Sequence, residues 1–123
     1  MHRILLVEDE TEILKIVKQF LERNGFDVIA ASTGRKAVDI VASGEKVDLA
    51  VLDVKMPGMN GLDCMKAIRK IKPSLPAFFL TGSIDRAKYM EDLETLGVDP
   101  EDVFQKPVDL YELVGRIKER LYG

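Results

Sequence analysis

The chain has 123 residues, which is the usual length of one domain and enough to bury a core. Its net charge of −3 disfavours direct binding to nucleic acid, and its single cysteine excludes an internal disulfide and a zinc site built from thiolates. Its apolar runs are too short to span a bilayer and its start lacks a signal peptide, so we expect a cytoplasmic protein without membrane contact.

Short apolar runs alternate with longer stretches of helical periodicity along the whole chain. In chain order, we expect a strand at Ile4–Val7, a helix at Glu10–Asn24, a strand at Asp27–Ala31, a helix at Thr33–Ser43, a strand at Leu49–Leu52, a helix at Gly61–Ile71, a strand at Ala77–Leu80, a helix at Ile84–Leu96, a strand at Val103–Gln105 and a helix at Val108–Leu121. The apolar stripes predict that Ile16 in the first helix and Ala87 and Met90 in the fourth face inward.

Five strand–helix units in a row predict an α/β fold with a doubly wound, five-stranded parallel sheet and five helices. The strands are apolar throughout rather than alternating, as expected of strands that are covered on both faces. We consider the strand order 2-1-3-4-5. Residues 1–123 are expected to form a single domain, with no output domain attached.

Polar side chains follow four of the five strands. Glu8 and Asp9 follow the first strand, Asp53 follows the third, Thr81 the fourth and Lys106 the fifth. Ligands of open parallel sheets bind beyond the carboxyl ends of the strands. If the first and third strands are neighbours, their carboxylates converge there.

Three carboxylates in one crevice repel each other unless positive charge lies among them, and one lysine cannot neutralise all three. Oxygen ligands without nearby Cys or His favour Mg²⁺, with Mn²⁺ as the alternative. A carboxylate left free can attack phosphorus and form an acyl phosphate. Lys106 would then neutralise charge on the phosphoryl group, and Thr81 would donate a hydrogen bond to it.

Each of these residues also has an ordinary structural interpretation. Asp9, with Glu10, can cap the following helix, Asp53 can be a turn residue, Thr81 can cap a helix, and Lys106 can be a surface lysine. These alternatives weaken together, because all of the residues fall at the same end of different strands.

Four segments together resemble the receiver domain of two-component response regulators, including the single-domain chemotaxis regulator, and the resemblance runs from Ile4 to about Leu121. The segments are Leu6-Val7-Glu8-Asp9-Glu10, Leu52-Asp53-Val54-Lys55-Met56-Pro57-Gly58-Met59-Asn60-Gly61, Leu80-Thr81-Gly82 and Gln105-Lys106-Pro107. The fold implied is flavodoxin-like.

The resemblance implies that Asp53 is the phosphoacceptor. Glu8, Asp9, Asp53 and the backbone carbonyl of Lys55 would hold Mg²⁺, Thr81 would be the switch hydroxyl, and Lys106 would pair with the phosphoryl group and Asp53. The family often has a cis bond before the proline, so a cis Lys106–Pro107 bond is expected.

The sequence departs from the family pattern in three places. Glu8 replaces the commoner aspartate. Val103 stands where the family usually has an aromatic switch residue, and Phe104 falls on the opposite face of its strand. The connection Gly97–Asp102 looks longer than usual.

Phosphorylation is expected to draw Thr81 and the 82–85 loop toward the phosphoryl oxygens. The fourth helix, fifth strand and fifth helix would then shift to control an effector protein, with Tyr89, Tyr111 and the Gly97–Asp102 loop as candidate contacts. The only histidine is His2, expected to be a solvated end residue, so a histidine kinase or phosphotransfer protein would phosphorylate the chain in trans. A monomer or weak dimer is expected.

Rival hypotheses remain open at this point. A phosphatase of the haloacid-dehalogenase kind needs a second aspartate where this chain has Lys55, and a flavodoxin-like cofactor binder needs a first loop that cradles phosphate, whereas Glu8, Asp9 and Glu10 would repel one. A scaffold that takes no phosphate is a third hypothesis. We expect a phosphoacceptor switch that catalyses only its own phosphorylation and dephosphorylation.

Overall fold

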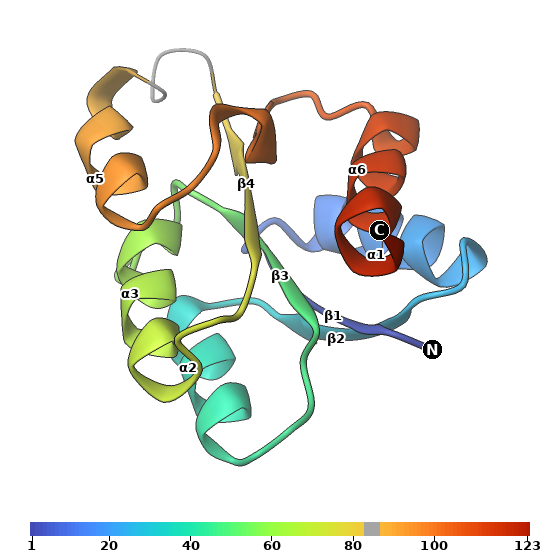
Figure 1. Cartoon of the computed structure of the whole chain (residues 1–123), viewed down its shortest axis with the longest axis horizontal. Helices are drawn as coiled ribbons and strands as arrows, with labels where there is room; N and C mark the ends of the chain where they lie inside the picture. Colours follow the sequence, from blue (N-terminus) through green and yellow to red (C-terminus); the bar gives the residue numbers. More distant parts are fainter. Residues whose placement is uncertain (83–86) are drawn as a thin grey trace.

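The strands form one parallel sheet in the order β2-β1-β3-β4-β5, as the sequence predicted. The computed structural model describes residues 1–82 and 87–123 (Figure 1). The expected start of the fourth helix at Ile84 and most of the 82–85 loop lie outside the described residues. The strands are β1 (Arg3–Val7), β2 (Asp27–Ala31), β3 (Leu49–Asp53), β4 (Ala77–Thr81) and β5 (Val103–Gln105).

Helices cover both faces of this sheet (Figure 1). The described residues form α1 (Thr11–Arg23), α2 (Gly34–Ala42), α3 (Gly61–Ile71), α5 (Met90–Thr95), the 3-10 helix η1 (Pro100–Asp102) and α6 (Leu110–Tyr122). α1 and α6 lie on one face and α2, α3 and α5 on the other. Because both faces are covered, β3 and β4 are buried along their whole length.

Side-chain caps fix the starts of three of the α-helices. Thr33 accepts a hydrogen bond from the backbone N–H of Lys36 at α2, and Asn60 accepts one from Asp63 at α3. Asp109 accepts hydrogen bonds from two backbone N–H groups at α6. These polar residues end the loops and set where each helix leaves the sheet.

Three predicted core positions are wrong. Ile16 of α1 is 55% exposed and Met90 of α5 is 52% exposed. Ala87, on the predicted stripe of the fourth helix, is also exposed. Each lies on the predicted apolar stripe, but the stripe is wider than the surface that the sheet and the neighbouring helices cover. The 3-10 helix η1 was not predicted, and His2, expected to be solvated, is half-buried with its ring edge-on to Tyr122.

Cys64 of α3 is fully buried between the sheet and α2. Burial raises the pKa of its thiol to about 12, so the side chain behaves as a small apolar group.

Among the described residues, no helix combines the length and the apolar character needed to cross a membrane.

Candidate functional site

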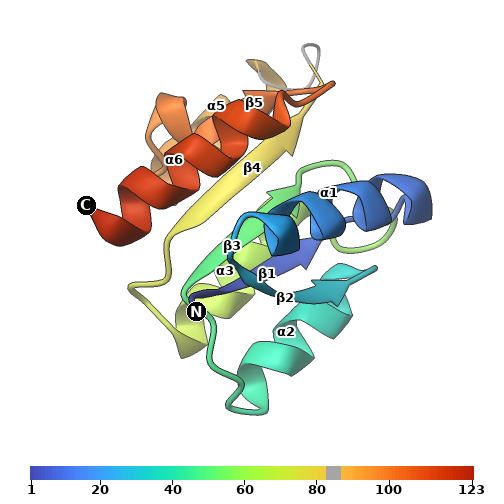
Figure 2. The same ribbon diagram turned by 90° about the vertical axis from the view of Figure 1, so that its right-hand side faces the viewer.

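The carboxyl ends of the strands meet at one edge of the sheet (Figure 2). The predicted site residues lie at or just after these strand ends. Backbone hydrogen bonds extend the pairing of the strands just past their ends. The N–H of Glu8 donates to the carbonyl of Ala31, and the N–H of Val54 donates to Leu80. The N–H of Lys106 donates to the carbonyl of Thr81 at 2.8 Å. The register of the sheet therefore places these residues next to one another.

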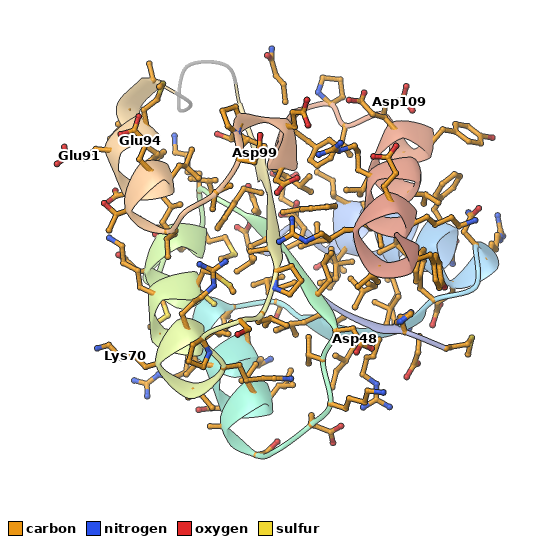
Figure 3. All side chains as sticks on the ribbon, viewed as in Figure 1. Asp48, Lys70, Glu91, Glu94, Asp99 and Asp109 are labelled. Carbon is orange, nitrogen blue, oxygen red and sulfur yellow. The ribbon has the colours of Figure 1, made fainter. Side chains whose placement is uncertain are left out.

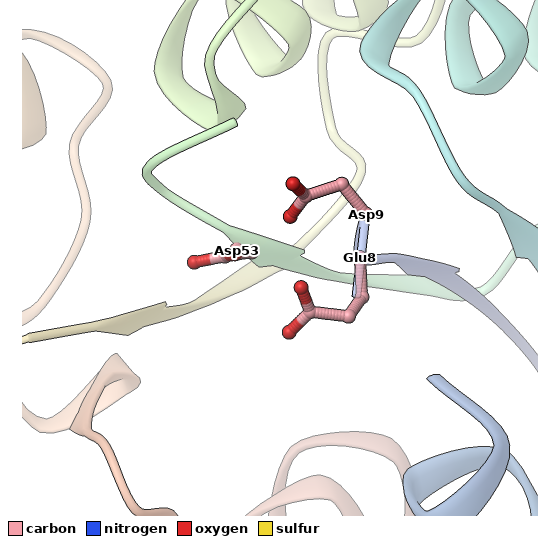
Figure 4. A group of neighbouring side chains, drawn as sticks. All are labelled: Glu8, Asp9 and Asp53. Atoms are coloured by element: carbon pink, nitrogen blue, oxygen red, sulfur yellow. The ribbon is translucent and has the colours of Figure 1, made fainter. Parts of the chain in front are cut away.

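Glu8, Asp9 and Asp53 form one acidic cluster, as the sequence predicted (Figure 4). One carboxylate oxygen from each lies within 4.8 Å of the other two. Asp9 is half-buried, whereas Glu8 is 1% exposed and Asp53 3% exposed. Carboxylates that are this close together and shielded from solvent repel each other strongly, so the cluster is suited to hold a cation.

Glu8 is the most constrained member of the cluster. Its Oε2 atom accepts a hydrogen bond from the backbone N–H of Glu10 at 3.2 Å, and its Oε1 atom lies 3.2 Å from Lys106 Nζ. Burial, and then the negative charge of Asp53, raise the pKa of Glu8 above its ordinary value. Its neighbours thus orient both oxygens at the edge of the sheet.

Lys106 bridges the two buried carboxylates and is not a surface lysine. Its Nζ lies 3.1 Å from Asp53 Oδ2 as well as 3.2 Å from Glu8 Oε1, and its side chain is 26% exposed. Burial alone would lower the pKa of Lys106. The hydrogen bond and charge of Asp53, together with the charge of Glu8, outweigh burial and raise it. The lysine is therefore held in its charged form beside these carboxylates.

The structure also bears on the ordinary structural interpretations of the other site residues. Asp53 is the last residue of β3 rather than a turn residue, and Glu10 at the start of α1 makes no side-chain cap. Thr81 is buried and its hydroxyl donates to the carbonyl of Gly82 at 3.2 Å. The side chain of Lys55 is exposed, two residues beyond Asp53.

Two further expectations hold around β5. The Lys106–Pro107 bond is cis. Val103 and Phe104 pack into the cores on opposite faces of the sheet. Val103 lines a cavity of about 260 Å³ with Met90, Leu93, Glu94, Val98 and Pro100.

Sequence reasoning missed two contacts of the site. It assigned Lys106 to Asp53 but not to Glu8, and it gave Gly61 no role, although Gly61 lies directly against the backbone of Asp53. A glycine at the start of a predicted helix was the only available signal for the second contact.

A family model described as the response regulator receiver domain matches residues 4–118. The transcriptional regulatory protein CpxR of Escherichia coli (strain K12) is 37% identical over 118 residues, which cover 96% of this chain and 48% of that protein. The alkaline phosphatase synthesis transcriptional regulatory protein PhoP of Bacillus subtilis (strain 168) is 39% identical over 116 residues, covering 94% and 47%. The chain spans about half the length of these two relatives.

Solved structures agree with this match. A receiver domain protein from Methanospirillum hungatei superimposes with a TM-score of 0.85 at 32% identity, covering 98% of this chain and 94% of that one. The chemotaxis protein CheY4 of Vibrio cholerae superimposes with a TM-score of 0.85 at 26% identity, covering 97% and 98%. The chain belongs to the response regulator receiver domain family, whose general function is to be phosphorylated and to control a partner.

Proposed function

We propose that this chain accepts a phosphoryl group on Asp53 in a reaction that depends on Mg²⁺. The observation that carries the proposal is the cluster of Glu8, Asp9 and Asp53, with carboxylate oxygens within 4.8 Å of one another and a single lysine beside two of them. A metal-binding cluster that also contains a nucleophile suits transfer of phosphorus to a carboxylate.

The donor set fits a hard divalent cation. The three side chains of the cluster offer only oxygen atoms, and Lys106 offsets only one of their three charges. We assign Glu8, Asp9, Asp53 and the backbone carbonyl of Lys55 to Mg²⁺, with Mn²⁺ as the alternative. When bound, the ion neutralises negative charge on the phosphoryl oxygens.

The chain's own residues supply the remaining chemistry. A carboxylate oxygen of Asp53 attacks phosphorus, so a bond forms between that oxygen and phosphorus while the bond from phosphorus to the donor breaks. Lys106, already 3.1 Å from Asp53, stabilises charge on the transferring group. Thr81, buried at the end of β4, donates its hydroxyl to a phosphoryl oxygen after exchanging its present partner, the carbonyl of Gly82.

The partners follow from this chemistry. A histidine kinase or phosphotransfer protein would supply the phosphoryl group in trans, and an effector protein would respond to it. We propose a cytoplasmic monomer or weak dimer without direct contact to nucleic acid, which catalyses only its own phosphorylation and dephosphorylation.

The first prediction tests the metal requirement. Wild-type protein incubated with acetyl phosphate and Mg²⁺ is expected to gain one phosphoryl group in intact-mass spectra. Excess EDTA should slow this gain at least about 100-fold, because the carboxylates then repel the incoming anion. The control is the same EDTA concentration with Mg²⁺ restored in excess. An equal rate with and without the metal would contradict the proposal.

The second prediction concerns the output face, formed by α5, β5 and α6. We propose that α5 and β5 move when Asp53 carries phosphate, and the cavity beside Val103 provides space for repacking. Amide chemical shifts recorded before and after addition of beryllofluoride and Mg²⁺ should change in α5 and β5 by more than in α2. Shifts confined to residues next to Asp53 would rule out this switch.

The exposed surface near α5 would then meet the effector. Glu91, Glu94 and Asp99 are exposed acidic residues of this region (Figure 3). Tyr111 at the start of α6 is 81% exposed, whereas Tyr89 packs partly against the core. Tyr111 is therefore the stronger of the two candidate contacts.

A further inference from the structure

We infer that the N-terminus of α3, through Gly61, positions Asp53 for phosphoryl transfer. This inference rests on the function proposed above and concerns a residue outside the reacting groups. A Cβ atom at position 61 would overlap the carbonyl oxygen of Asp53, and would lie 3.0 Å from its carbonyl carbon and 3.2 Å from Val54 Cα. The obstacles are all backbone atoms, which cannot rotate away as a flexible side chain can. Only glycine allows α3 to begin this close to the end of β3.

A backbone hydrogen bond also joins the start of α3 to the end of β3. The N–H of Gly61 donates to the carbonyl of Val54 at 2.8 Å. The connection of residues 54–60 is therefore a loop whose two ends touch. Asn60 then caps α3 by accepting a hydrogen bond from the N–H of Asp63 at 2.8 Å. The start of the helix is fixed on one side by its cap and on the other by the strand end that carries Asp53.

The backbone at Asp53 is thus held from two directions. On one side, the N–H of Val54 donates to the carbonyl of Leu80 in β4 at 2.9 Å, and on the other side lies Gly61. The side chain of Asp53 is only 4% exposed and has little room to compensate for a moved backbone. Displacing α3 at its start should therefore displace the Asp53 carboxylate relative to Lys106 and to the acidic cluster.

The third prediction uses two glycine substitutions that differ in their surroundings. Gly61→Ala introduces the overlap, whereas Gly115→Ala in α6 places its methyl group where no heavy atom lies within 4 Å. We expect Gly61→Ala to slow phosphorylation by acetyl phosphate at saturating Mg²⁺ about 100-fold, since small misplacements of a reacting group have effects of that size. Gly115→Ala should stay within about twofold of the wild-type rate, because alanine is accommodated readily in a helix.

A second matched pair covers the case in which Gly61→Ala does not fold. Asn60→Ala removes the cap of α3, and Thr33→Ala removes the equivalent cap of α2, in which Thr33 Oγ1 accepts from the N–H of Lys36 at 3.1 Å. Both variants lose one cap of the same kind. Asn60→Ala should slow phosphorylation about tenfold, through a partial displacement of Asp53, and Thr33→Ala should not.

The structural readout is independent of the chemistry. Amide chemical shifts of Asp53 and Val54 in metal-free protein should move in Asn60→Ala and in folded Gly61→Ala, and should stay in place in the two controls. Wild-type protein that forms no adduct would overturn the proposed function, and these shifts would then decide the positioning alone. Normal wild-type phosphorylation, with Asn60→Ala matching Thr33→Ala in rate and shifts, would overturn the positioning role.

Discussion

Replacing Asp53 by asparagine is expected to abolish phosphorylation by acetyl phosphate, with a rate at least about 1000-fold below that of the wild type. The substitution keeps the size of the side chain but replaces a charged nucleophilic oxygen by a neutral amide. It also removes one of the three carboxylates of the cluster, so the site loses charge for the metal as well. Intact mass after incubation with acetyl phosphate and Mg²⁺ measures the outcome directly.

Asp63→Asn is the matched control for this substitution. Asp63 is an exposed aspartate in the first turn of α3, close in sequence but outside the acidic cluster. Its variant should gain the phosphoryl group at the wild-type rate. Phosphorylation of Asp53→Asn, or an equal loss of phosphorylation in Asp63→Asn, would refute the assignment of Asp53 as the phosphoacceptor.

Replacing Lys106 by methionine is expected to destabilise the metal-free protein by about 2 kcal/mol, even though the two side chains have similar length. Glu8 and Asp53 are buried, and each lies within 3.2 Å of the Lys106 ammonium group, so the variant leaves two dry carboxylates without their cation. Removing one partner of a fully buried ion pair commonly costs more, but Lys106 is 26% exposed and water offsets part of the loss. Urea unfolding in EDTA measures the change.

Mg²⁺ and a second lysine provide the controls. Added Mg²⁺ should reduce the loss of stability in Lys106→Met, because a bound cation replaces the missing positive charge beside the carboxylates. Lys118 is an exposed lysine of α6, and Lys118→Met should change the free energy of unfolding by less than about 0.5 kcal/mol. Equal destabilisation by the two substitutions would show that Lys106 does not hold the carboxylates together.

Much of the fold was predictable because the hydrophobic periodicity of each segment indicates whether it forms a strand or a helix. Gly61–Ile71 was predicted with its observed bounds, because its apolar stripe has helical periodicity and stops before Pro73. The strand order was also confirmed. Periodicity could not decide how much of each stripe would be covered, so Ile16 and Met90 were assigned to the core and are exposed. That outcome depends on the positions of neighbouring helices, which no local pattern contains.

The candidate site was also predictable only in part. The meeting of Glu8 with Asp53 followed from one rule of parallel sheets, because residues at the carboxyl ends of adjacent strands share an edge. The contact of Lys106 with Glu8 depends on side-chain conformations across 98 positions of sequence. The approach of Gly61 to Asp53 depends on how a loop closes. Sequence therefore indicated which groups gather, but not which of them touch.

The shortness of β5 has a consequence for behaviour at high concentration. β5 ends the sheet opposite β2 and spans only the three residues Val103–Gln105. An unpaired strand edge is the usual template on which a foreign strand extends a sheet, and proteins commonly avoid aggregation by keeping that edge short. At this edge the sheet therefore offers a foreign strand only a short stretch of backbone on which to pair.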